Sequence, residues 1–273
     1  MNRDAIGKIV VYFLFAVALI WALFPLYWVF STSVKPPSRI FTIPPTLIPD
    51  ALTFENYQRL SEVMPYLQHF LNSTIITGGA LALGLIIGGV AAYGLSRYRF
   101  PGSRLILTFV VVSRMIPLVA FVIPIYFIER DWGLINQYFG VILSHLIIVL
   151  PFTIWLMKSF FDEIPKAYEE AAMVDGASRL HAMMIAMRLA LPGLGTTAIL
   201  AFLDSWNEFM FALTLTTTPA TQTLPVAIAL QLQRPYNVPW GVITAGSFLF
   251  SLPVFALGYF IQKYVARTFV LGV

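Results

Sequence analysis

Six long apolar segments dominate this 273-residue chain and restrict what it can fold into. Hydrophobic residues make up 59% of the sequence, charged residues make up 11%, and the mean hydropathy is +0.81. So few polar side chains cannot cover a soluble domain of this length in water. A membrane-spanning helix needs about 20 mostly apolar residues. We therefore predict an all-α membrane protein with six transmembrane helices, at residues 9–30, 70–95, 105–128, 138–157, 189–215 and 240–261.

The basic residues predict the orientation of these spans, because short loops rich in lysine and arginine stay in the cytoplasm. With the N-terminus in the cytoplasm, eleven of the 17 basic residues lie inside: Arg3, Lys8, Arg97, Arg99, Arg104, Lys158, Lys166, Arg179, Arg188, Lys263 and Arg267. The outer side holds Lys35, Arg39, Arg59, Arg130 and Arg234. We therefore expect both termini and the 158–188 loop to be cytoplasmic, and the 31–69 loop to be external.

Two segments on the predicted outer side are rich in proline. Residues 31–69 contain six prolines and residues 216–239 contain four. That density rules out long helices and favours extended, turn-rich loops. We expect both loops to be available for contact with an external partner.

The 158–188 segment concentrates charge in a chain that otherwise carries little. It must therefore leave the membrane. Pro165 suits the first turn of a helix, and Asp162 and Glu163 suit its positive N-terminal end. Gly176 is well placed to end that helix, and Ser178 to cap a second one.

Small side chains at Ala167, Ala171 and Val174 share one face of this predicted helix, at i, i+4, i+7 spacing. Two interpretations fit this face. One is an amphipathic helix that lies on the membrane surface. The other is a surface that another protein approaches closely, with Glu170 at its margin.

Short motifs along nearly the whole chain resemble those of the inner-membrane permeases of carbohydrate-importing ATP-binding-cassette (ABC) systems. Within that family the chain is similar to the second maltose permease subunit. The charged loop carries Glu170-Ala171-Ala172 followed by Gly176. The other motifs include Phe24-Pro25-Leu26-Tyr27-Trp28, Arg97-Tyr98-Arg99-Phe100-Pro101-Gly102, Arg114-Met115-Ile116-Pro117, Trp206-Asn207-Glu208-Phe209 and Thr223-Leu224-Pro225-Val226. Each motif is weak alone, and their order is specific.

The resemblance implies a type I ABC importer permease fold in a bacterial or archaeal inner membrane. It implies a homologous second permease, two ATPase subunits that bind ATP and Mg²⁺, an extracytoplasmic solute-binding protein and a sugar substrate. For this chain it implies no catalytic residue, metal, bound cofactor or nucleic-acid partner. The implied ATPase-coupling residues are Glu169, Glu170, Ala171, Ala172, Asp175 and Gly176.

One position departs from the family pattern. The family has a proline some dozen residues after the loop glycine, where this chain has Arg188, and only the later Pro192 is kept. We therefore expect the second half of the loop to be more continuously helical than in its relatives.

Three formal charges fall within the predicted spans: Arg114, Asp204 and Glu208. Charges in a membrane are costly unless they are paired or face water, so these are functional candidates. Asp204, Asn207, Glu208 and Phe211 would share one face of a continuous helix. Such a face could line a path for a hydroxylated solute. Alternatively, Arg114 pairs with Glu208 or Asp204 and simply joins two spans.

Other functional classes find less support in the sequence. The chain has no cysteine, no HExxH or GxSxG motif, and no phosphate-binding G-x-x-x-x-G-K-[ST] loop. A proton- or sodium-driven carrier would carry more buried carboxylates and matching broken halves. An ABC permease for a glycerol phosphate or a peptide differs in solute only. Arg114 is the single intramembrane arginine, which favours a neutral sugar.

Overall fold

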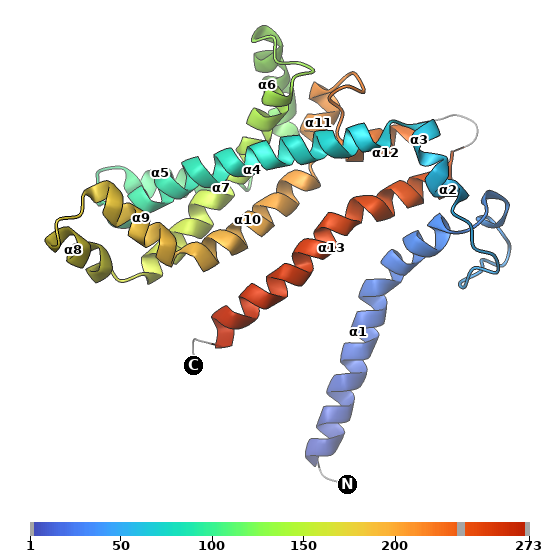
Figure 1. The fold of residues 1–273 in the computed structure, drawn as a ribbon, viewed down its shortest axis with the longest axis horizontal. Coiled ribbons are helices and arrows are strands. Elements are labelled where there is room, and N and C mark those ends of the chain that lie inside the picture. Colours follow the sequence, from blue (N-terminus) through green and yellow to red (C-terminus); the bar gives the residue numbers. More distant parts are fainter. Residues whose placement is uncertain (1–2, 234–237, 271–273) are drawn as a thin grey trace. The chain divides into compact units, whose positions relative to one another are not determined.

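The computed structural model describes residues 3–233 and 238–270, and side-chain surroundings for 7–233 and 238–259. Arg234 and Pro235 lie outside the described residues. Every regular element in the described ranges is a helix (Figure 1). In chain order they are α1 (Arg3–Ser33), η1 (Pro37–Arg39), α2 (Glu55–Gln58), α3 (Leu60–Val63), α4 (Tyr66–Arg97), α5 (Ser103–Ser113), α6 (Val119–Asp131), α7 (Tyr138–Glu163), α8 (Ala167–Val174), α9 (Arg179–Leu189), α10 (Leu191–Trp206), α11 (Met210–Leu215), α12 (Leu224–Gln231) and α13 (Trp240–Val270).

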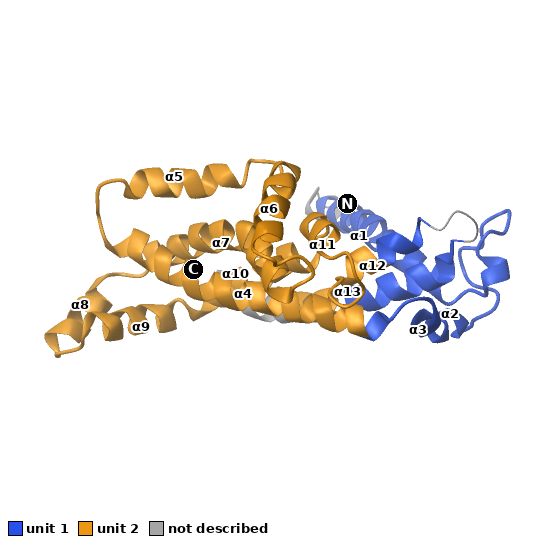
Figure 2. Ribbon diagram, turned by 90° about the horizontal axis from the view of Figure 1, so that it is seen from above, with its two compact units in different colours: residues 1–67, 228–252 blue, residues 68–227, 253–273 orange. Residues whose placement is uncertain are grey.

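The chain divides into two compact units (Figure 2). One comprises residues 1–67 and 228–252, and the other comprises residues 68–227 and 253–273. The candidate site residues predicted from the sequence all belong to the second unit. Four helices in the described chain are long and apolar enough to cross a membrane: α1, α4, α7 and the Trp240–Tyr259 part of α13.

The core of the second unit forms where α4 passes close to α7. Gly84 and Gly88 of α4 are buried and face Val149 and Thr153 of α7. A Cβ atom built on Gly88 would lie 2.7 Å from Thr153 Cγ2. The missing side chains therefore let the two helices approach each other, as small residues do in membrane proteins.

The third predicted span, 105–128, is not one helix. It comprises α5 and α6, and residues 114–118 between them are not helical. Pro117 explains the break, because it lacks an N–H group and disfavours helical geometry at the residue before it. Hydropathy over a window of residues does not register such an interruption.

The fifth predicted span, 189–215, is also interrupted. α9 is continuous through Arg188, where the family pattern has a proline, and the chain then bends by 70° into α10. Pro192 lies in the first turn of α10, where a proline is tolerated. α10 ends at Trp206 and α11 begins at Met210, so the predicted face of Asp204, Asn207, Glu208 and Phe211 is divided between two helices. The six-span arrangement stays a prediction.

The proline-rich 31–69 segment contains only short helices between α1 and α4, as expected. Its chain is held by a buried amide, because Asn56 Nδ2 donates to the carbonyl oxygens of Ser33 (2.9 Å) and Lys35 (2.8 Å). The Lys35 Nζ donates to Thr46 O at 2.6 Å. Side-chain hydrogen bonds to backbone carbonyl oxygens therefore hold this loop in an ordered structure.

The loop after α11 is attached to the first turns of α4. Asn72 Nδ2 donates to Ala220 O (3.1 Å) and Gln222 O (2.9 Å), and Ser73 Oγ accepts from Leu224 N at 2.8 Å. The other end of α4, at Arg97, lies beside the 158–188 loop (Figure 1).

We predict that Gly84→Leu lowers the melting temperature of the purified protein, because the added side chain would collide with Val149. Overpacking of this kind costs about 1–3 kcal/mol. Gly94→Ala is the matched control, since its Cβ would meet no atom within 4 Å. Equal melting temperatures for Gly84→Leu and Gly94→Ala would contradict the close approach of α4 and α7.

Candidate functional site

The charged 158–188 loop consists of the end of α7, then α8, then α9. Asp162 and Glu163, which we expected near the N-terminal end of the loop helix, precede α8 and belong to the last turn of α7. Asp162 accepts hydrogen bonds there from Lys158 Nζ and Ser96 Oγ, each at 2.6 Å. Lys166 is the N-cap of α8, and Pro165 lies one residue before it.

The turn between α8 and α9 has the predicted caps. Gly176 has a φ of +90°, and its N–H bonds to Met173 O while that of Ala177 bonds to Ala172 O. This is the glycine-dependent Schellman ending of a helix. Ser178 Oγ then accepts from His181 N at 3.3 Å and caps α9. The turn is therefore specified locally by Gly176 and Ser178.

The predicted coupling residues separate into two groups. Glu170, Ala171, Asp175 and Gly176 are exposed, and Ala172 is half-buried. The adjacent Val174 is 87% exposed, which leaves an apolar side chain at the tip of the loop. Glu169 is instead buried and faces the rest of the unit.

Glu169 forms an ion pair that the sequence did not reveal. Its Oε1 lies 2.6 Å from Arg97 Nε, and its Oε2 accepts from the Tyr93 hydroxyl at 2.6 Å. Arg97 also donates to Phe161 O (2.7 Å) and Ile164 O (3.1 Å). The sequence indicates a cytoplasmic side and a family motif for Arg97, and it predicts no partner for this side chain. Its spacing of four residues from Tyr93 at the end of α4 was the available signal.

α9 is held by apolar packing. Ala186 and Ala190 belong to a buried cluster with Tyr93 of α4 and Met157 and Phe161 of α7. Both helices of the loop are thus attached to the same ends of α4 and α7. Figure 1 and Figure 2 show α8 and α9 at one end of this unit, away from α6 and α11.

The second candidate site is a cavity of about 470 Å³ that lies between the two helix breaks. Arg114 Nη2 lies 2.9 Å from Asp204 Oδ2, and Nη1 donates to Ile148 O at 3.1 Å. Of the two bridges considered from the sequence, the structure forms the one to Asp204. Both side chains of the pair remain about a third exposed. The lining residues are Ser113, Arg114, Ile116, Leu118, Phe121, Ile147, Ile148, Asp204, Asn207, Glu208, Phe209 and Met210.

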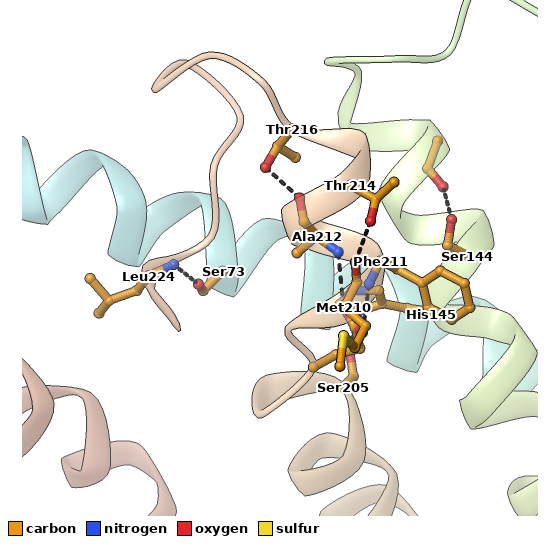
Figure 3. A network of polar contacts seen from close by, with 12 residues as sticks. Ser73, Ser144, His145, Ser205, Met210, Phe211, Ala212, Thr214, Thr216 and Leu224 are labelled. Carbon is orange, nitrogen blue, oxygen red and sulfur yellow. Dashed lines mark hydrogen bonds and ion pairs between the residues drawn. The ribbon is translucent and has the colours of Figure 1, made fainter. Parts of the chain in front are cut away.

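Glu208 lies at the buried edge of this cavity and stabilises the break between α10 and α11. Its carboxylate accepts from Phe211 N (2.8 Å) and Ala212 N (3.1 Å), and lies 3.2 Å from His145 Nε2. His145 Nδ1 in turn lies 2.8 Å from Ser205 Oγ, where α7, α10 and α11 meet (Figure 3). His145 is therefore a buried, hydrogen-bonded residue at the point where these helices pack together.

The cavity thus collects four of the five residues predicted for a path, and Phe211 is fully buried and does not line it. Its walls offer hydrogen-bond donors and acceptors beside apolar side chains. Among the residues that the structure describes, no group of three or more His, Cys, Asp or Glu could hold a metal ion.

A solved structure has the same fold. A bacterial ABC transporter involved in the import of the acidic polysaccharide alginate matches with a TM-score of 0.83, covering 97% of this chain and 98% of its own, at 24% identity. The fold is therefore that of an ABC importer permease.

Comparison with known sequences gives the family. Residues 80–270 match the family described as "Binding-protein-dependent transport system inner membrane component". The diacetylchitobiose uptake permease DasC of Streptomyces coelicolor is 32% identical over 264 residues, covering 96% of this chain and 95% of the relative. The trehalose transport permease SugB of Mycobacterium tuberculosis is 36% identical over 245 residues, covering 89% of each. This chain belongs to that family, whose members are transport subunits and not enzymes.

Glu208→Ala is predicted to lower the melting temperature strongly, because it leaves His145 and two backbone N–H groups without their carboxylate. Removing one partner of a buried pair costs about 3–5 kcal/mol. Asp204→Asn is the control, since its partly exposed carboxylate faces the cavity and the loss should be smaller. Equal melting temperatures for Glu208→Ala and Asp204→Asn would show that Glu208 does not stabilise the first turn of α11.

Proposed function

We propose that this chain is the permease subunit of a sugar importer and forms half of the translocation path. The named relatives DasC and SugB support a sugar, since diacetylchitobiose and trehalose are the solutes in their names. The charge of the cavity supports a neutral one. Its lining charges are Arg114, which is paired with Asp204, and Glu208, which faces His145. A permanently anionic solute would require an excess of positive charge, which the described lining does not supply.

The exposed end of the charged loop is proposed to contact an ATPase subunit. Glu170, Ala171, Ala172, Asp175 and Gly176 present small and acidic groups around the turn, so a partner's backbone can approach closely. Two such ATPases would bind ATP and Mg²⁺, and their closure would rotate the spans as rigid bodies. This chain itself would hold no nucleotide.

The remaining partners are proposed on the surfaces that the chain leaves uncovered. No residue in the most apolar window of α1 is buried by the described chain, which suits contact with lipid and a homologous second permease. The 31–69 and 216–239 segments would face an extracytoplasmic solute-binding protein. The distribution of basic residues supports cytoplasmic termini.

Gly176→Val should abolish uptake while the protein remains in the membrane. A β-branched residue at a φ of +90° is strained by about 1–2 kcal/mol and would reshape the turn that meets the ATPase. Uptake by whole cells and the amount of protein in membrane fractions are the measurements.

Gly102→Val is the matched control, because Gly102 has a φ of +88° and lies outside the 158–188 loop. It imposes the same backbone strain elsewhere and should retain most uptake. Normal uptake by Gly176→Val would show that the turn does not transmit ATPase motion.

The solute is predicted to be a neutral di- or oligosaccharide. The importer should copurify with its solute-binding protein, and native mass spectrometry of that protein would weigh the bound ligand. Trehalose and diacetylchitobiose are the first probes for stimulation of ATP hydrolysis, and glycerol phosphate is the control. A phosphorylated or otherwise anionic ligand would refute the argument from cavity charge.

A further inference from the structure

Two adjacent glutamates on α8 lie in different surroundings. Glu170 is exposed, whereas the Glu169 side chain is only 7% exposed and contacts Arg97, whose side chain is 6% exposed. Successive residues on a helix point about 100° apart, so one cannot replace the other. The two residues must therefore serve different purposes in the same loop.

Arg97 joins three segments at one point. Its Nε binds the Glu169 carboxylate of α8, and its two terminal nitrogens bind the carbonyl oxygens of Phe161 and Ile164 at the end of α7. Arg97 itself is the last residue of α4. The planar guanidinium fixes these directions, which a lysine could not do. We call Arg97, Glu169 and Tyr93 the arginine clamp.

The contacts of the arginine clamp are suited to fixing the position of α8 relative to α4 and α7. A buried ion pair adds little net stability relative to apolar side chains of similar volume, whereas loss of one partner is costly. Apolar packing already attaches α9 to the same helix ends through Ala186 and Ala190. The clamp adds a directional attachment for α8, the helix that carries the exposed coupling residues.

We infer that Arg97 and Glu169 are positioning residues for energy transmission, which make α8 move as one body with the ends of α4 and α7. The inference rests on the proposed coupling function and assigns to Glu169 a role inside the permease. Motion imposed on the exposed residues would then pass through the clamp to α4 and to α7, which contributes Ile147 and Ile148 to the cavity wall. Without the clamp, α8 would follow the ATPase while α4 stayed behind.

The test uses the complete importer in lipid nanodiscs with a Ser113→Cys reporter. The natural chain has no cysteine, and Ser113 lines the cavity. The rate at which a maleimide labels this cysteine is measured with and without ATP and vanadate. No solute is needed, so the readout is independent of the sugar.

Adding Glu169→Gln should reduce the ATP-dependent change in labelling rate by about tenfold, a size typical of a lost coupling between two sites. The ATPase subunits should still copurify. Tyr93→Phe, which keeps the ring and removes only the hydroxyl bond, should give a smaller loss.

Arg99→Ala is the matched control for charge, since Arg99 lies two residues after Arg97, between α4 and α5, and no described residue forms an ion pair with it. It should leave the response unchanged. A full response in Glu169→Gln would overturn the inference, and so would loss of the ATPases from that variant, which would place Glu169 at the ATPase contact. A Ser113→Cys reporter that ignores ATP without any further change would instead refute the proposed function.

Discussion

A helix that breaks inside a membrane must find partners for its free backbone groups within the protein, because lipid offers none. The break between α10 and α11 meets that constraint with a charged side chain, because Glu208 accepts two N–H groups of α11. Arg114, beside the break between α5 and α6, instead donates to the Ile148 carbonyl oxygen within α7. The cavity lies beside the points where these helices stop and restart, and Arg114 and Glu208 are among the residues that line it.

The charged loop is held in shape by two kinds of contact. Its outer turn depends on Gly176 and Ser178, which act through local backbone bonds. Its inner side depends on contacts between residues far apart in the chain, the Arg97–Glu169 pair and the apolar cluster beneath α9. Local caps therefore set the shape of the loop, and distant contacts set its attachment to the bundle.

This difference explains what could be predicted. Apolar segments and helix caps are encoded within a few residues, so four long spans, the Gly176 turn and the Ser178 cap followed from the sequence. The breaks near Pro117 and Asn207 did not, because hydropathy averages over longer windows. The direction of the Glu169 side chain and the burial of Phe211 depend on which residues from other parts of the chain pack against them. From the sequence, Arg114 could pair with either Asp204 or Glu208. The structure shows that it pairs with Asp204.

α4 has an attachment near each end, through Asn72 and Ser73 to the loop after α11 and through Arg97 to the charged loop. At 1.5 Å per residue, its 32 residues form a rod about 48 Å long. Because α4 is attached to neighbouring segments near both ends, a tilt of the helix imposed at one end also moves the other end. Linkage between distant sites is reciprocal. Under the proposed function, solute capture beside one end of α4 and nucleotide binding beside the other end would therefore each affect the affinity of the other site.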